Sequence, residues 1–300
     1  SSVGFAEVTV IDDQGRHRLA DDVVRLPTDL FDTITETLTH PLAVVLTRLR
    51  VPGSVAVRTS PETSITRTFT VPDDRAYALT GTIRLSPAAL EDSVLDSALG
   101  LPLADRGGIT VTSRRRLPGG IENRASAAID GDPDTWYSPG YLGQNGEWID
   151  VDSAVPFTFD HLDLTVLNDG RHSVPRRVRL EVDGQYHPDL VFTLPEIGDQ
   201  DEPNARHTFQ IELPRSITAN RIRFVVEESP EDPTASVREV TTLDWYSGDE
   251  IVMPIGIVDL GIDGLQIGQP PAAVPSGCRD DLLEVDGRPI SVALSGTSAD

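Results

Sequence analysis

The sequence predicts an all-β protein made of antiparallel β-sandwiches, with one or two short helices. Apolar residues alternate with polar ones over short segments, a pattern typical of strands with one buried and one solvated face. Turns rich in the chain's 24 glycines and 23 prolines separate these segments, whereas apolar residues at helical spacing are rare. The clearest alternating segments are 162–166, 178–182, 209–213 and 222–226.

The N-terminal part shows the same alternation over 65–71, with one charged intruder, and over 79–85. We expect one helix to start near Thr28, because apolar residues follow it at helical spacing. A second helix should begin with Ser86 as its N-cap and a proline in its first turn, and should end just before Gly100.

Two glycine-containing boundaries divide the chain into three predicted parts. Residues 1–107 would form a β-sandwich with helices, and residues 108–248 would form a second sandwich. Residues 249–300 contain two expected strands, 257–262 and 290–294. These strands either complete the first sandwich or open a third unit. We favour completion, because two strands alone would be poorly stable.

Acidic residues dominate the composition, with 48 Asp and Glu against 25 Lys and Arg and a formal net charge of −23. Such a chain would repel a phosphate backbone, so nucleic acids are excluded as partners. The basic run Arg114–Arg116 is interpreted as a solvated strand end. All basic residues are arginine, which fits either a GC-rich genome such as that of an actinobacterium or the acidic surface of a halophile.

The single cysteine, Cys278, cannot form an internal disulfide. It is either a free thiol or the partner of a cysteine outside this chain. No segment approaches the roughly 18 apolar residues of a membrane-spanning helix. The chain begins at Ser1 without a methionine or a signal peptide, so we expect it to be part of a longer protein.

The loop 127–137, with the sequence AAIDGDPDTWY, is the most informative segment of the chain. It places oxygens of Asp130, Asp132, Asp134 and Thr135 within one tight turn, and Ca²⁺ prefers about six to eight such oxygens. An EF-hand is excluded, because the glycine and the glutamate that its loop requires are both missing. The alternative to a calcium site is an acidic turn that is well capped without metal.

Residues 108–248 resemble the discoidin superfamily, which includes the coagulation factor V/VIII C-type domains and related carbohydrate-binding modules. The resemblance rests on the order and spacing of five segments. They are Ile109–Ser113, the loop 127–135, Gly146–Asp152, Arg221–Val225 and the closing Arg238–Val240. The resemblance implies an eight-stranded jelly-roll sandwich of the galactose-binding-like type.

The same resemblance implies a structural calcium ion that holds the loop in place. Its ligands would be the Ala128 carbonyl, the Asp130 carboxylate, the Asp132 carbonyl, Thr135 and Glu239. The chain departs from the family pattern at one position, where the family usually has a tryptophan two residues after the threonine. Here Tyr137 stands there, with Trp136 before it. Either Tyr137 takes the packing role and Trp136 points outward, or the loop is shifted.

Ligand recognition in such modules uses loops at one end of the sandwich, with an aromatic ring against the sugar and polar side chains on its hydroxyls. The candidates here are Trp136, Tyr137, Tyr141, Asn168, Asp169, Arg171 and His172. Core packing is the alternative for the aromatic residues, and turn formation is the alternative for 168–170. Binding through one ring and a few hydrogen bonds would be weak, at about −4 to −8 kcal/mol.

The sequence offers no catalytic residues. It contains no His-Glu-x-x-His, no Gly-x-Ser-x-Gly, no phosphate-binding loop and no cysteine cluster. Its six histidines are scattered singly. Carboxylates are so abundant that their pairing says nothing about glycosidase chemistry.

The flanking segments are similar to the soluble, extracytoplasmic region of actinobacterial arabinofuranosyltransferases of the D type. Those proteins are membrane glycosyltransferases that build cell-wall arabinan. The matching segments are Arg67–Pro72, Leu79–Ser86 and Leu283–Pro289. The resemblance implies that the chain is part of a larger, membrane-anchored protein of the cell envelope, and that the catalytic residues lie outside it.

We therefore expect a non-catalytic, extracytoplasmic region that binds a cell-wall glycan, arabinan or a related polysaccharide, for a glycosyltransferase. The first alternative is a structural spacer or a protein-docking surface without sugar binding. The second is a hydrolase domain, which rests only on carboxylates that cannot be assigned a role.

Overall fold

The computed structural model describes residues 9–11, 17–19, 23–25, 66, 68–70, 91–117, 121–141, 143–227, 236–241 and 250–297. The chain divides into two compact units, residues 1–89 and 90–300. In the first unit, β1 (Thr9–Ile11) pairs antiparallel with β2 (His17–Leu19), and β3 (Val23–Arg25) pairs parallel with β4 (Thr68–Thr70). The helix expected near Thr28 and the strand expected over 79–85 lie outside the described residues.

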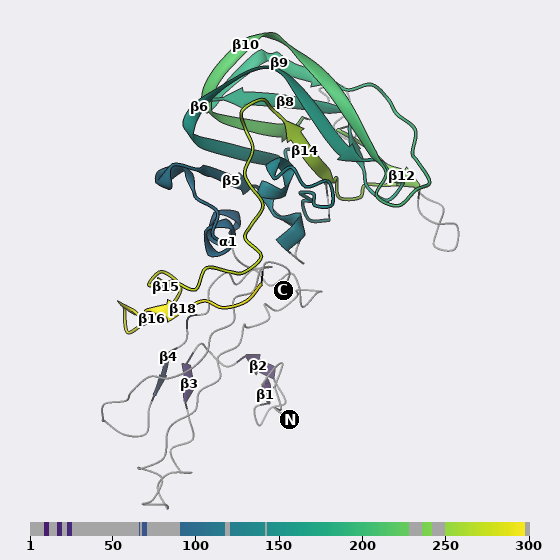
Figure 1. Ribbon diagram of the computed structural model, residues 1–300. Coiled ribbons are helices and arrows are strands. Elements are labelled where there is room, and N and C mark those ends of the chain that lie inside the picture. The colour runs from purple at the N-terminus through teal and green to yellow at the C-terminus, as the bar shows by residue number, and fades with distance from the viewer. Residues whose placement is uncertain are drawn as a thin grey trace, which may run out of the picture. The chain divides into compact units, whose positions relative to one another are not determined.

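The second unit is built on a continuous antiparallel sheet with the strand order β14-β6-β10-β8-β9 and with β5 added to β6 (Figure 1). The sheet folds over on itself, because β6 and β10 are long enough to run through both layers of a sandwich. One layer contains β5, β8, β9 and one half of each long strand, and the other contains β14 and the remaining halves. This arrangement confirms the predicted antiparallel, mostly β class. The strands are β5 (Ile109–Ser113), β6 (Trp148–Leu167), β8 (Arg177–Val182), β9 (Gln185–Thr193), β10 (Arg206–Val226) and β14 (Ile257–Gly261).

Prolines lie near the places where the two long strands pass between the layers. Pro156 lies in β6 and Pro214 in β10, and the register between the strands shifts between Glu212 and Ile217. Proline donates no hydrogen bond to a ladder, so it is tolerated at such an irregularity. Four separate strands were predicted here, over 146–152, 162–166, 209–213 and 222–226. In the structure the first two segments lie in the single strand β6 and the last two in the single strand β10, because the backbone bends between them while staying extended.

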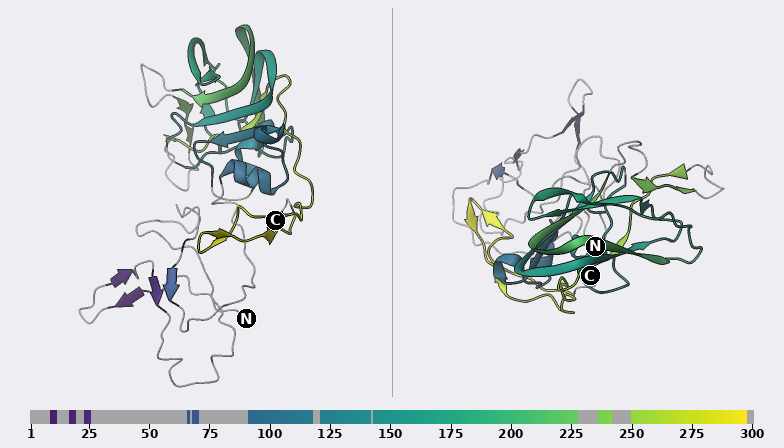
Figure 2. Two further views of the ribbon diagram at one scale, coloured as in Figure 1. Left: turned by 90° about the vertical axis from the view of Figure 1, so that its left-hand side faces the viewer. Right: turned by 90° about the horizontal axis from the view of Figure 1, so that it is seen from above.

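Helix α1 (Asp92–Ala98) precedes the sandwich and packs against β5 and the 3₁₀-helix η6 (Ala125–Ile129) (Figure 2). Gly100 follows the helix with a φ of +90°, as expected for a glycine that ends a helix. The predicted N-cap, Ser86, lies outside the described residues. Within them the helix begins at Asp92, a buried residue that faces β5.

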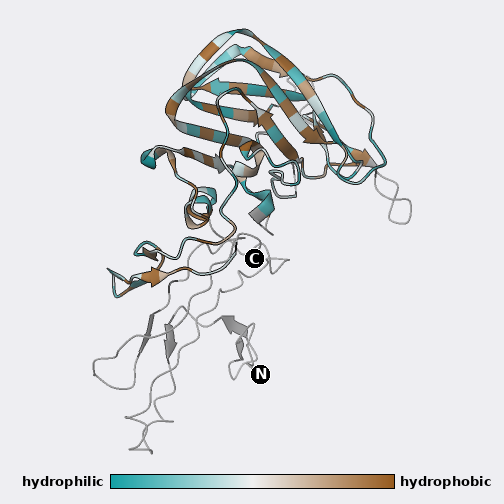
Figure 3. Cartoon of the chain, viewed as in Figure 1, coloured by the Kyte–Doolittle hydropathy of each residue, from teal (hydrophilic) through white to brown (hydrophobic). Residues whose placement is uncertain are grey.

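Alternating side chains from both layers meet in one apolar core. Figure 3 shows the alternation itself, as hydrophobic and hydrophilic residues follow one another along the long strands. In β6, Ile149 and Val151 face inward from one layer, and Leu162 and Leu164 face inward from the other. Burying a side chain of this size contributes about 1.5–3 kcal/mol. A shift of one residue would turn all of them outward, so the core fixes the register of the long strands.

The C-terminal strand β14 lies in the central sheet, where it pairs with β6. The expected division placed this strand with residues 1–107 or in a third unit. The structure differs because β14 covers the edge of β6 and buries Ile257 and Leu260 in the same core. No helix among the described residues is long and apolar enough to cross a membrane.

Short elements complete the second unit, and several of them pair in twos: β7 with β11, β12 with β13, β15 with β18, and β16 with β17. Their bounds are η4 (Ala104–Arg106), η5 (Ile121–Asn123), β7 (Val174–Pro175), β11 (Val237–Arg238), β12 (Val240–Thr241), β13 (Glu250–Ile251), β15 (Cys278–Arg279), β16 (Glu284–Val285), β17 (Arg288–Pro289) and β18 (Val292–Ala293).

Candidate functional site

The acidic loop, residues 130–135, begins where η6 ends. The carboxylate of Asp130 turns back over the loop, and its Oδ1 accepts hydrogen bonds from the N–H of Asp132 (2.9 Å) and the hydroxyl of Thr135 (2.9 Å). Asp132 in turn accepts a hydrogen bond from the N–H of Asp134 (2.9 Å). Aspartate side chains commonly form such turns with the backbone two residues on, so the loop largely shapes itself.

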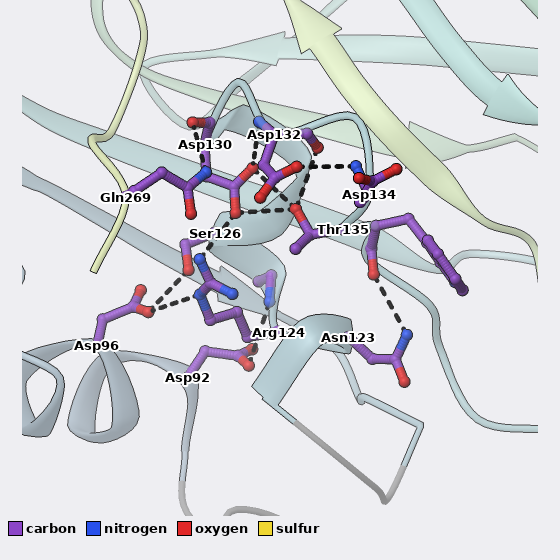
Figure 4. Close-up of polar contacts among 12 residues, drawn as sticks. Asp92, Asp96, Asn123, Arg124, Ser126, Asp130, Asp132, Asp134, Thr135 and Gln269 are labelled. Atoms are coloured by element: carbon purple, nitrogen blue, oxygen red, sulfur yellow. Dashed lines mark hydrogen bonds and ion pairs between the residues drawn. The ribbon is translucent and has the colours of Figure 1, made fainter. Parts of the chain in front are cut away.

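The buried guanidinium of Arg124 lies between the acidic loop and helix α1 (Figure 4). Its Nη2 is 2.8 Å from Oδ2 of Asp130, and its Nε is 3.6 Å from Oδ1 of Asp96. The hydroxyl of Ser126 donates to the same Asp96 oxygen at 2.7 Å. One arginine, only 2% exposed, therefore connects carboxylates from two separate elements.

Burial changes the acidity of both carboxyl groups. Desolvation raises the pKa of Asp96 to about 7, although the hydrogen bond from Ser126 and the charge of Arg124 oppose the shift. Desolvation also raises the pKa of Asp130, against the N–H of Asp132 and the charge of Arg124. Arg124 lies closer to Asp130 and keeps this partner when Asp96 is protonated.

The segment that follows β14, residues 262–269, covers the acidic loop, and we call it the strap. The side-chain amide of Gln269 donates to the carbonyl of Asp130 at 3.1 Å. Gln266 lies so close to Gly131 that a Cβ atom there would come within 2.0 Å of the Gln266 amide nitrogen. Gly131 also has a φ of +72°, so its backbone conformation favours glycine.

The described residues fit the predicted calcium ion poorly. Three predicted ligand atoms do converge, because the Thr135 hydroxyl lies within 3.2 Å of the Asp130 carboxylate and the Asp132 carbonyl. These oxygens are joined to protein donors, and Arg124 holds Oδ2 of Asp130. Among the described residues, no three or more His, Cys, Asp or Glu side chains form a group that could hold a metal. The side chain of Ala128 lies in the core, and its carbonyl as a ligand stays a prediction.

Glu239, the remaining predicted ligand, stays a prediction. This residue stands between β11 and β12, and within the described part of the chain it makes no hydrogen bond or ion pair with the acidic loop. A carboxylate that the sequence did not select, Asp259 in β14, lies close enough to Asp130 to be affected by its charge. Burial, followed by the charges of Asp130 and Asp163, raises the pKa of Asp259 to about 6. The sequence missed it because β14 was assigned to another part of the fold.

Of the two aromatic residues that follow the acidic loop, one is internal and one lies at the surface. Tyr137 is 1% exposed, and its hydroxyl donates to the carbonyl of Arg115 at 2.8 Å. Its backbone pairs with Ile257. Trp136 is half-buried. Tyr137 therefore fills the packing position, and we drop it from the candidate ligand-binding residues.

Trp136 contacts His172 from the neighbouring loop, with 6.2 Å between ring centroids and 77° between ring planes. Nδ1 of His172 is 2.9 Å from Oδ1 of the buried Asp169. The same carboxylate accepts hydrogen bonds from the N–H groups of Arg171 (3.0 Å) and Asn204 (3.2 Å). Although burial opposes it, the hydrogen bond from His172 and that from Arg171 lower the pKa of Asp169. Asp169 thus positions His172 and does not face solvent.

Asn168 has a similar internal role. It is buried, its amide donates to the carbonyl of Gly198 at 2.8 Å, and its Oδ1 accepts a hydrogen bond from Arg238 at 3.0 Å. Arg238 also pairs with Asp199. Asn168 and Asp169 therefore hold the loop together, as the turn interpretation predicted, and their side chains are not free to bind a ligand.

Two further candidates are exposed. Arg171 lies at the surface, and its guanidinium makes no hydrogen bond or ion pair within the described part of the chain. Tyr141 is 60% exposed. It belongs to a loop that Arg115 holds, through hydrogen bonds to the carbonyls of Tyr141 (3.0 Å) and Gly143 (2.6 Å) and an ion pair with Glu147 (2.6 Å).

The interpretation of Arg114–Arg116 as a solvated strand end is therefore wrong for two of the three residues. Arg115 holds the Tyr141 loop, and Arg116 is nearly buried with its Nε 3.4 Å from Asp92.

Sequence reasoning also missed Arg124. The one available signal was a charged residue directly before the small, apolar run 125–129.

Three loops meet around Trp136. The acidic loop reaches β10 through an ion pair between Asp134 and Arg206 (3.2 Å), and Asn204 reaches the 168–173 loop through Asp169. Within the described residues, no hydroxyl or thiol bonds to the other ring nitrogen of His172, so no nucleophile and base are paired there. The arrangement can hold a ligand but shows no catalytic constellation.

Comparison with known families adds one decisive match. The family description "F5/8 type C domain" fits residues 109–240. This part of the chain is an F5/8 type C domain. It contains the acidic loop, Trp136 and the 168–173 loop, whereas helix α1 and strand β14 lie outside the matched residues.

Several solved structures are similar to the chain. A family 32 carbohydrate-binding module of Clostridium perfringens NanJ, in complex with galactose, is 13% identical, with a TM-score of 0.31 and coverage of 50% of this chain and 90% of that one. A chitosan-binding module of Paenibacillus sp., in complex with chitotriose, is 11% identical at a TM-score of 0.31, covering 53% and 95%. A Ruminococcus gnavus fucosidase is 15% identical at 0.31, covering 59% and 28%. No curated protein matches the chain.

Proposed function

We propose that the F5/8 type C domain binds a glycan at a rim formed by Trp136, Arg171 and His172. The observation that carries the proposal is the contact between the half-buried indole of Trp136 and an imidazole that a buried carboxylate holds in place. An aromatic face beside fixed polar groups is what a sugar ring needs, because its C–H face is apolar and its edge carries hydroxyls.

Each rim residue has a distinct role in this proposal. The indole of Trp136 would stack on the C–H face of the sugar. If Nδ1 of His172 donates to Asp169, then Nε2 of the neutral ring accepts a hydrogen bond from a sugar hydroxyl. The guanidinium of Arg171 would donate to other hydroxyls or to a carboxylate. Tyr141 could extend the surface for a longer chain.

We further propose a cell-envelope setting, in which this region holds cell-wall arabinan for a membrane-anchored glycosyltransferase on the extracytoplasmic side. The support is the similarity of the flanking segments and the arginine-only composition. The arabinan proposal can be tested separately from glycan binding in general. The test compares the affinity of the chain for oligo-arabinofuranosides with its affinity for oligogalactans and for chitotriose. Preference for either of the other two ligands would contradict the arabinan proposal without contradicting glycan binding.

Isothermal titration of the chain with arabinan, galactan and chitosan oligosaccharides tests the proposed function. We expect weak but saturable binding of one of these oligosaccharides, which Trp136→Ala weakens strongly and Tyr186→Ala preserves. Tyr186 is the matched control, because it is 57% exposed and lies beside the turn between β8 and β9. The proposal would be contradicted if both variants lost the same amount of oligosaccharide affinity, or if the wild type bound no oligosaccharide.

One observation favours the second candidate, a spacer or docking module. Three of the seven predicted ligand residues are buried, namely Tyr137, Asn168 and Asp169. Few predicted residues therefore remain at the surface to bind a glycan. On this account no oligosaccharide binds, and Trp136→Ala changes neither stability nor any glycan affinity.

A further inference from the structure

We infer that the guanidinium of Arg124 takes the place of a metal ion in the acidic loop. It holds the loop through Asp130 and ties it to helix α1 through Asp96, so the loop is stable without calcium. The inference is independent of glycan binding.

The first argument is charge. Asp96 and Asp130 have no exposed side-chain surface, and an ionised carboxylate in such a place is costly unless a positive charge compensates it. Arg124 is the arginine that contacts both, at 2.8 Å and 3.6 Å. A guanidinium presents donors in several directions of one plane, so it can serve two carboxylates as an ion would.

The second argument is that the oxygens of Asp130 are already used. Its Oδ1 accepts from the N–H of Asp132 and the hydroxyl of Thr135, and its Oδ2 accepts from Arg124. The strap covers the backbone of the loop through Gln269. A calcium ion would have to displace these donors and leave the buried guanidinium without its nearer partner.

The third argument is the anchoring of the helix. Asp92 and Asp96 are four residues apart, so both lie on the same face of α1. Asp92 accepts hydrogen bonds from the N–H (3.1 Å) and hydroxyl (2.6 Å) of Ser113, and Asp96 accepts one from Ser126. Although α1 precedes the matched residues 109–240, it belongs to the domain's structure through these contacts and Arg124.

The strongest argument for a metal is Asp259. Its carboxylate is partly buried near Asp130 and Asp163, and within the described residues it has no ion-pair partner. It would be the next ligand of a bound cation, so the test includes its amide variant.

The experiment compares thermal unfolding of the EDTA-treated chain with and without millimolar CaCl₂, for the wild type, Asp130→Asn and Asp259→Asn. We expect the wild-type Tm to be the same in both conditions. A rise of several degrees that both substitutions abolish would overturn the inference. A rise that survives both substitutions places the ion elsewhere and supports the inference for this loop.

A second arm tests the ion pair itself. Arg124→Met should lower the Tm by several degrees, whereas Arg206→Met, which removes the exposed arginine paired with the same loop, should hardly change it. Combining Arg124→Met with Asp130→Asn should lower the Tm by less than the two single shifts together, and additive shifts would contradict the inference. If Arg124→Met does not fold, the calcium comparison decides alone.

Discussion

The acidic loop and the neighbouring 168–173 loop contain the same residue types but direct them differently. In the acidic loop, Asp130 and its cationic partner Arg124 are both buried, so the pair is an internal contact of the fold. In the second loop, Asp169 is buried but its partner His172 is one-fifth exposed. The comparison teaches that the exposure of the partner, rather than the presence of an aspartate, separates an internal anchor from the proposed recognition surface.

Removing the internal partner should have the largest effect. Arg124→Met leaves two buried carboxylates without their cation, and breaking a buried pair in this way costs about 3–5 kcal/mol. Arg206→Met removes an exposed pair, with side chains 34% and 88% exposed, and should cost at most about 1 kcal/mol. Urea unfolding at neutral pH measures the stability of both variants. Equal losses of unfolding free energy would contradict the distinction between the buried and the exposed ion pair.

The pH dependence of stability sharpens the same contrast. Because the pKa of Asp96 is raised to about 7 in the folded protein, the folded state holds a proton that the unfolded state loses near pH 4. This contribution is complete below pH 4 and is lost as the pH rises through about 7. Asp96→Asn should therefore gain stability relative to the wild type between pH 4 and 8.

The direct readout is urea unfolding of both proteins across that pH range. Parallel stability curves would show that Asp96 has an ordinary pKa. The comparison with Asp96→Asn cancels the contributions of other carboxyl groups, including Asp169, whose pKa is lowered.

On the recognition side, Trp136→Ala should weaken binding of the preferred oligosaccharide at least about tenfold, or ~1.4 kcal/mol. The unfolding free energy should change little, because the indole is only half-buried. Titration calorimetry and urea unfolding of the same samples separate the two effects. A large loss of stability would show that Trp136 belongs to the core.

The smallest effect concerns Tyr137. Tyr137→Phe keeps the ring in the core but removes the hydrogen bond to the carbonyl of Arg115, which should cost about 0.5–1.5 kcal/mol. Glycan affinity should stay unchanged. A change in affinity without a change in stability would return Tyr137 to the set of ligand-binding residues.

The sequence predicted the strands well, because period-two alternation directly reports which face is buried. Leu162 and Leu164, or Ile222 and Phe224, are buried where the pattern placed them. It did not predict that these segments join across a bend, because alternation on each side of a bend is the same as that of two separate strands. It also misplaced β14, because a short alternating segment does not specify its partner.

The candidate site was only partly predictable for a related reason. The loop 127–137 and the 168–172 segment were recognised from their residue types, but burial separates Tyr137 from Trp136 and Asn168 from Arg171. Arg124 lies only six residues before Asp130, but its second partner, Asp96, lies in helix α1, and Asp259 comes from a strand that the sequence placed elsewhere. No local pattern encodes such tertiary contacts.

The most direct test of glycan binding at the rim uses the indole N–H signals of Trp136, Trp148 and Trp245 in a ¹⁵N NMR titration. Trp148 is a useful internal reference, because Arg223 stacks on its ring at 4.4 Å in the sheet. We predict that only the Trp136 signal moves, and that it saturates, as an arabinan oligosaccharide or another glycan is added. If the Trp136 signal stays in place while the glycan binds, the rim is not the binding site.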